Sequence, residues 1–190
     1  TPKACMHEGI ISDPASMTQA IKELLKAGGI TAKQAVISVQ GGSVVVRSAR
    51  MPKMAEQVLR KTIRYEASRY IPSSVEDSFI EFEILRDVDD SQMDVLIVAA
   101  PRELVSSRVA AVTAAGLEVE IVDVGPFASF RSVLETSFVQ DPDMACAVID
   151  LGAAMTTVSV VANGSFSMTR TVSSGSAALT DALKTFFDLS

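Results

Sequence analysis

Short runs of alternating apolar and polar residues recur along most of the 190-residue chain. A period of two residues places apolar side chains on one face of a β-strand, so each run predicts a half-buried strand. The clearest run covers residues 78–85, in which Ile80, Phe82 and Ile84 share one face and glutamates lie on the other. Similar or more continuously apolar runs predict strands over residues 34–40, 43–50, 93–100, 117–124, 145–149, 157–161 and 165–171.

Longer segments between these runs have the period of an amphipathic helix. Residues 53–70 carry the strongest signal, because Leu59, Ile63 and Ala67 form one apolar stripe. The Ile71-Pro72 pair stops this helix. Further helices are predicted over residues 14–27, 103–115, 126–138 and 177–187. This mixture of strands and helices predicts an α/β (α+β) fold class.

The order of these elements predicts four units. Residues 43–124 follow the order β-α-β-β-α-β, which is typical of a compact two-layer unit of about 80 residues. The carboxylates of this unit lie on strand faces or in turns without a partner base, so we expect an interaction module rather than a catalytic one. We predict domains at residues 1–42, 43–124, 125–143 and 144–190, of which the third is a connecting helix and loop.

The stretch 145–171 is the best candidate for chemistry. A buried strand over residues 145–149 delivers Asp150 to its end, a small-residue turn follows, and Asn163-Gly164 predicts a tight hairpin. Main-chain N–H groups can converge on a phosphate oxygen in such a turn, and the aspartate could hold a metal-bound water. A purely structural hairpin explains the same pattern, and this alternative stays open. The candidate contacts of the turn are Gly152, Ala153, Ala154, Thr156 and Thr157.

Small residues also precede the last predicted helix, at residues 173–176. A helix N-terminus of this kind can approach an anion through its N–H groups and its dipole. Simple capping of the helix explains the same pattern, and we favour capping.

Composition narrows the function classes. The net charge of −6 argues against general binding to nucleic acid or to an anionic membrane, because either partner needs a basic patch. His7 is the only histidine, so a histidine-based triad or a multi-histidine metal site cannot form, and no metal is assigned. Two cysteines are too few for a disulfide framework, and no apolar run reaches the roughly 18 residues of a membrane span. We therefore expect a cytoplasmic protein, and the start at Thr1 indicates a fragment of a longer chain.

Five stretches resemble, in order and spacing, the family of the type IV pilus assembly protein PilM. This family is actin-like and related to the cell-division protein FtsA. The similar stretches are ASRYIP at 67–72, MDVLIVAA at 93–100, AGLEVEIVDVGPF at 115–127, the strand and turn at 145–160, and the helix at 175–189.

The resemblance implies a partial actin-like (ribonuclease H-like) fold with an inserted FtsA-type β-α-β-β-α-β subdomain. It implies that stretch 145–171 is the second phosphate hairpin of an ATP site, with Asp150 facing the metal or water and Gly175 near the ribose and phosphates. The implied cofactor is ATP with Mg²⁺ in the full-length protein. The first phosphate loop and the adenine region have no counterpart here, so we expect no nucleotide on this fragment. The implied cofactor-binding set is Asp150, Gly152, Ala153, Ala154, Met155, Thr156, Thr157 and Gly175.

The resemblance also implies a scaffold function. The unit 43–124 and the neighbouring lobe would bind the N-terminal cytoplasmic tail of a PilN-like inner-membrane protein, close to the helix at 53–70. Other implied partners are pilus components such as the assembly ATPase, a second copy of the chain, and the inner face of the inner membrane through PilN. No general base is identifiable, so we do not expect an enzyme. The alternatives are an ATPase or small-molecule kinase of the actin-like superfamily and an FtsA-like filament former.

Overall fold

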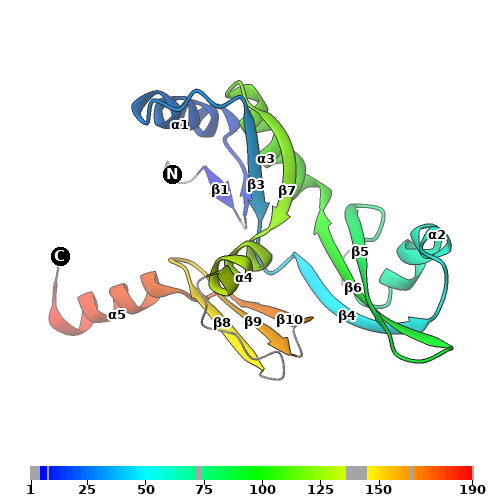
Figure 1. Ribbon diagram of the computed structural model, residues 1–190. Coiled ribbons are helices and arrows are strands. Elements are labelled where there is room, and N and C mark those ends of the chain that lie inside the picture. The colour runs from blue at the N-terminus through cyan, green and yellow to red at the C-terminus, as the bar shows by residue number, and fades with distance from the viewer. Residues whose placement is uncertain (1–4, 8, 72–73, 136–144, 163–164, 190) are drawn as a thin grey trace.

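The computed structural model describes residues 5–7, 9–71, 74–135, 145–162 and 165–189 (Figure 1). Within these ranges the helices are α1 (Pro14–Ala27), α2 (Glu56–Ala67), α3 (Arg102–Ala114), α4 (Gly125–Glu135) and α5 (Ser176–Phe187). The strands are β1 (Met6–His7), β2 (Ile10–Ile11), β3 (Gln34–Val39), β4 (Val45–Pro52), β5 (Ser78–Asp87), β6 (Gln92–Pro101), β7 (Glu118–Val124), β8 (Cys146–Leu151), β9 (Thr156–Ala162) and β10 (Ser165–Val172). Within the described ranges the predicted helices and strands are therefore confirmed, while the short pair β1–β2 was not predicted. The end of the helix predicted over residues 126–138 and the loop predicted at 139–143 lie outside the described residues. The predicted Asn163-Gly164 turn lies outside the described residues.

Six strands form one antiparallel sheet in the order β5-β6-β4-β10-β9-β8. Its two faces are covered by different helices because successive side chains of a strand point to opposite sides. On one face, Leu59 and Ile63 of α2 pack against Val95 and neighbouring residues of β4 and β6. On the other face, Leu96 belongs to a cluster that includes residues of α4 and β10. The predicted stripe of the 53–70 helix is thus the stripe that fills the core.

A second, two-stranded sheet pairs β3 with β7 in parallel. Helix α3 packs against α1 and brings Leu104 and Val105 to Val39 of β3. Figure 1 shows this sheet with α1 and α3 on one side of the molecule, the six-stranded sheet on the other, and α4 at their junction.

Strand β7 does not join the sheet of β4, β5 and β6. The β-α-β-β-α-β order expected over residues 43–124 is present, but its strands do not share one sheet, because its last strand pairs with β3 and its last helix packs on β3. The physical reason is that α3 buries its apolar residues against β2, β3 and α1, which carries the chain away from the first sheet. The division into four domains stays a prediction.

The strand β8 is less buried than its sequence predicts. It lies at the edge of the six-stranded sheet, and Ile149 and Leu151 are 65% and 60% exposed. Cys146 is half-buried rather than enclosed. A run of apolar residues predicts a strand, but its burial depends on what covers both faces. None of the helices in the described ranges is long and apolar enough to cross a membrane.

Candidate functional site

The candidate phosphate hairpin lies where β8 turns into β9. The two strands pair so that Asp150 is opposite Thr157 and Leu151 is opposite Thr156. The N–H of Gly152 donates to the carbonyl of Met155 at 3.0 Å, which closes the turn. Asp150 is exposed at the end of the strand, as the sequence predicts.

The N-terminus of α5 packs directly onto this turn. The N–H groups of Ser176 and Ala177 donate to the carbonyls of Gly152 and Ala153 at 2.9 and 3.0 Å. A Cβ at Gly175 would lie 2.3 Å from the Gly152 carbonyl oxygen, so only glycine allows the approach. The turn carbonyls therefore accept from the first N–H groups of the helix, while no side chain caps it. The same contacts bring Gly175 beside Gly152 and Ala153, which are far from it in sequence.

The two threonine hydroxyls after the turn already have partners. Thr156 Oγ1 donates to the carbonyl of Ser174 at 2.7 Å, which ties the hairpin to the segment before α5. Thr157 is buried, and its hydroxyl lies 3.4 Å from that of Thr171 on the paired strand. Both groups therefore stabilise the hairpin and would have to exchange a partner to contact an anion.

The remaining donors of the turn are main-chain groups. Among the described residues, no hydrogen bond uses the N–H groups of Ala153, Ala154 or Met155. Ala153 and Ala154 are exposed and carry only a methyl group, so a phosphate oxygen could reach their N–H groups without a steric barrier. These residues fit a phosphate contact. No cluster of three or more metal-ligating side chains occurs in the described part of the chain, so Asp150 would need ligands from water and nucleotide to hold Mg²⁺.

A second feature, which the sequence analysis missed, is a groove of about 360 Å³ between β5 and α4. We call it the aromatic groove. Phe166 of β10 forms its floor and meets Phe127 and Phe130 of α4 edge-on, with ring centroids 4.7 and 6.1 Å away. Its lining residues are Glu83, Ile84, Leu85, Leu96, Phe127, Phe130, Arg131 and Phe166. The only sequence signal was the spacing of Phe127 and Phe130 on one helix, because Phe166 is distant in the chain.

The helices and the mainly antiparallel sheet define a mixed α/β protein, which confirms the α/β (α+β) class predicted from the sequence. The model of the family described as "Type IV pilus assembly protein PilM" matches residues 1–190, and the chain belongs to this family.

Solved structures agree with this assignment. A chain of the "PilM-PilN type IV pilus biogenesis complex" matches with a TM-score of 0.88 and 29% identity over 100% of this chain and 57% of that chain. The present chain thus spans little more than half the length of that relative. The ethanolamine utilization protein EutJ of Carboxydothermus hydrogenoformans matches at TM-score 0.57 and 15% identity over 98% of this chain and 46% of that one. The cytoplasmic domain of EpsL from Vibrio cholerae matches at TM-score 0.54 and 18% identity, over 82% of this chain and 56% of that one. The last two likenesses concern the fold alone.

Proposed function

We propose that this chain is the partner-binding part of a cytoplasmic scaffold in type IV pilus assembly, and that it binds the N-terminal tail of a PilN-like inner-membrane protein. The observation that carries the proposal is the match along the whole chain to a structure described as a PilM-PilN complex. Through this tail the scaffold associates with the inner face of the inner membrane. Contacts with further pilus components, such as the assembly ATPase, and with a second copy belong to the same proposal.

The aromatic groove is the site that we propose for the tail. The sequence pointed to the helix at 53–70 and its adjoining strands, but the face of the sheet under α2 is filled by a packed core. The opposite face of β5 and β6 opens into the groove between those strands and α4. Its aromatic walls suit apolar side chains of an extended peptide. Glu83 is exposed at the rim and forms no ion pair within the described ranges, so it favours a cationic residue of the tail.

Calorimetry with a PilN tail peptide and the full-length protein tests this site. Leu85 of β5 lines the groove and packs against the cluster of Leu96 and Phe166, whereas Val88, just beyond the same strand, lies outside the groove. We expect Leu85→Asp to weaken tail binding by about tenfold or more, because it places a charge against an apolar peptide, while Val88→Asp leaves binding unchanged. Equal effects of both substitutions, or none, would rule out the groove. If the tail peptide does not bind the folded wild-type protein, the proposed function itself is wrong.

We further propose that the full-length protein binds ATP with Mg²⁺ and that the candidate phosphate hairpin forms one wall of that site. The support is the set of exposed N–H donors at Ala153 and Ala154 beside Asp150. A fluorescent ATP analogue should bind full-length wild-type protein more tightly with Mg²⁺ than with EDTA. Asp150→Asn should remove this difference, whereas Asp181→Asn on the exposed surface of α5 should keep it. A difference that persists in Asp150→Asn would contradict the assignment.

The roles of enzyme and filament former predict other results. An ATPase or kinase would show turnover that disappears in Asp150→Ala. A filament former would scatter light in a manner that depends on protein concentration and ATP. The scaffold proposal predicts neither result.

A further inference from the structure

Two arginines of the chain differ from the others in their contacts. Eight of the ten arginines donate to a carboxylate or a main-chain carbonyl within the described residues: Arg50, Arg60, Arg64, Arg69, Arg86, Arg102, Arg108 and Arg131. The side chains of Arg47 and Arg170 form no ion pair or hydrogen bond in the same ranges. Both of these arginines line one hollow of about 190 Å³, although they are distant in sequence.

The hollow results from an interrupted strand pairing. β4 and β10 are neighbours in the sheet, but Met168 opposite Arg47 is the single pair that joins them in the described residues. Continuing this antiparallel register would place Arg170 opposite Val45. Instead, residues 44–46 and 169–171 line the two sides of the hollow, so the strands separate there. We call this space the arginine hollow.

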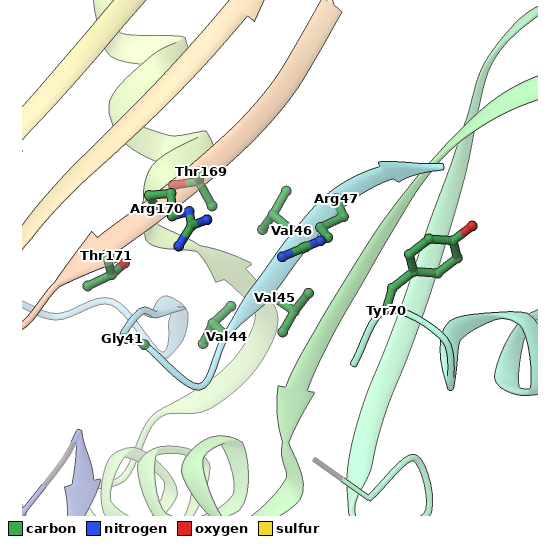
Figure 2. Close-up of a pocket in the computed structure, with 10 residues that line it drawn as sticks. Gly41, Val44, Val45, Val46, Arg47, Tyr70, Thr169, Arg170 and Thr171 are labelled. Atoms are coloured by element: carbon green, nitrogen blue, oxygen red, sulfur yellow. The ribbon is translucent and has the colours of Figure 1, made fainter. Parts of the chain in front are cut away.

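The side chains around the arginine hollow give it a positive character. Figure 2 shows the guanidinium groups of Arg47 and Arg170 directed toward each other from opposite strands. No carboxylate is among the residues that line the hollow, in a chain of net charge −6. At its end, Gly41 and Gly42 leave open space, because a Cβ on either would meet nothing within 4 Å. Its lining residues are Gly41, Gly42, Val44, Val45, Val46, Arg47, Tyr70, Thr169, Arg170 and Thr171.

We propose that the arginine hollow binds a carboxylate side chain of an extended acidic peptide segment. A guanidinium group presents its N–H donors as a planar fork that matches a carboxylate in a bidentate manner, so two facing arginines can hold one glutamate or aspartate between them. The separated strands offer main-chain groups to a peptide that adds in an extended conformation. This site is distinct from the aromatic groove, with which it shares no lining residue.

The size and position of the hollow favour a peptide over other anions. A volume of about 190 Å³ is smaller than the roughly 300–1,000 Å³ of typical small-molecule sites, so the hollow suits a single side chain better than a whole nucleotide. The net charge of −6 of the chain opposes the approach of an anionic membrane. A free phosphate shares the oxyanion chemistry, and the experiment must separate it from a peptide carboxylate.

Fluorescence anisotropy with the full-length protein at low salt tests the proposal. The probe is a labelled, capped heptapeptide of valine and threonine with two central glutamates. A control peptide of the same length carries glutamines in place of the glutamates. We expect the glutamate peptide to bind about tenfold or more tightly than the control peptide. The double variant R47A/R170A should lose this preference. The matched control K22A/K61A, which removes the same charge from exposed positions on α1 and α2, should keep it.

A second variant separates binding from folding. R47K/R170K keeps both charges, and we expect it to melt like wild type but to lose most of the preference, because lysine lacks the planar fork. Equal binding of the two peptides would overturn the proposal, as would a preference that survives R47A/R170A. Inorganic phosphate that competes as well as the unlabelled glutamate peptide would assign the hollow to a free anion and overturn it too. Binding to phosphatidylserine vesicles that depends on both arginines, without binding of the glutamate peptide, would assign the arginine hollow to a membrane and would also overturn the proposal.

Discussion

Helices α2 and α5 have the same length, 12 residues, and carry similar apolar stripes, but they are held in different ways. In α2, Leu59, Ile63 and Ala67 are buried against the six-stranded sheet. In α5 no residue is buried, and Phe186 is 81% exposed. The contact of α5 with the hairpin is made by main-chain hydrogen bonds at its first turn. A hydrophobic pattern thus forms a helix in both places, but only α2 has a surface within the described residues that covers its stripe.

The largest expected effect is a loss of stability when a buried leucine of α2 is shortened, compared with an exposed leucine of α5. Leu59→Ala should lower the free energy of unfolding by about 3 kcal/mol, because it leaves a cavity in the core under α2. Leu183→Ala, at a partly exposed position of α5, should cost less than about 0.5 kcal/mol. Urea denaturation of both variants measures the contrast. Similar losses in the two variants would show that α5 has a covered apolar face.

The next effect concerns the main-chain contact of α5. Gly175→Ala should cost about 1–3 kcal/mol, because its Cβ would collide with the carbonyl oxygens of Gly152 and Ala153. Hydrogen exchange should then become faster at Ser176 and Ala177, whose N–H groups are bonded to the turn. Gly42→Ala is the control, since a Cβ there meets no atom within 4 Å. Unchanged exchange in Gly175→Ala would mean that the turn does not hold the helix.

The smallest effect depends on pH and concerns β6, a strand of the sheet on which α2 packs. Asp94 of β6 accepts from Arg50 at 2.9 Å and from Arg86 at 3.1 Å, one on each neighbouring strand. The hydrogen bond from Arg50 is the main cause that lowers the pKa of Asp94 below its usual 3.8. A lowered pKa stabilises the folded state above the unfolded pKa, and this contribution is lost as the pH falls through the folded pKa.

We therefore expect Asp94→Asn to be less stable than wild type at pH 7, with a difference that shrinks as the pH falls below about 4. Urea midpoints of both proteins at several pH values measure this convergence. Asp181→Asn on α5, whose carboxylate forms no ion pair in the described ranges, is the control and should be as stable as wild type at pH 7. A constant gap between Asp94→Asn and wild type would contradict the role of the ionised carboxylate.

Local pattern was sufficient to predict the elements but not their partners. The periodicity of Ile80, Phe82 and Ile84 predicts β5, because it depends only on neighbours in the chain. The pairing of β7 with β3 could not be read in this way, since the two strands are about 80 residues apart in sequence and many registers fit. This is also why the unit 43–124 looked like one module.

In the candidate hairpin, too, the sequence predicts the local features but not the contacts between distant residues. Small residues and Asp150 at a strand end were readable from the sequence. The hydrogen bond from Thr156 to the carbonyl of Ser174 was not, because it depends on how the segment before α5 returns to the turn. The residue pattern marked 173–176 only as a helix start that could approach an anion, and the family resemblance assigned Gly175 to the nucleotide site. The close contact of Gly175 with Gly152 gives that glycine a structural reason. The aromatic groove and the arginine hollow both combine residues from distant strands, so neither had a contiguous motif.

Hydrogen exchange of the full-length protein, with and without the tail peptide, tests whether the tail of a PilN-like protein occupies the aromatic groove between β5 and α4. A tail bound there should slow exchange in β5 and α4 and leave exchange unchanged in α2, which packs on the other face of the sheet. Protection confined to α2, or no protection at all under conditions where the peptide binds, would contradict this placement of the tail.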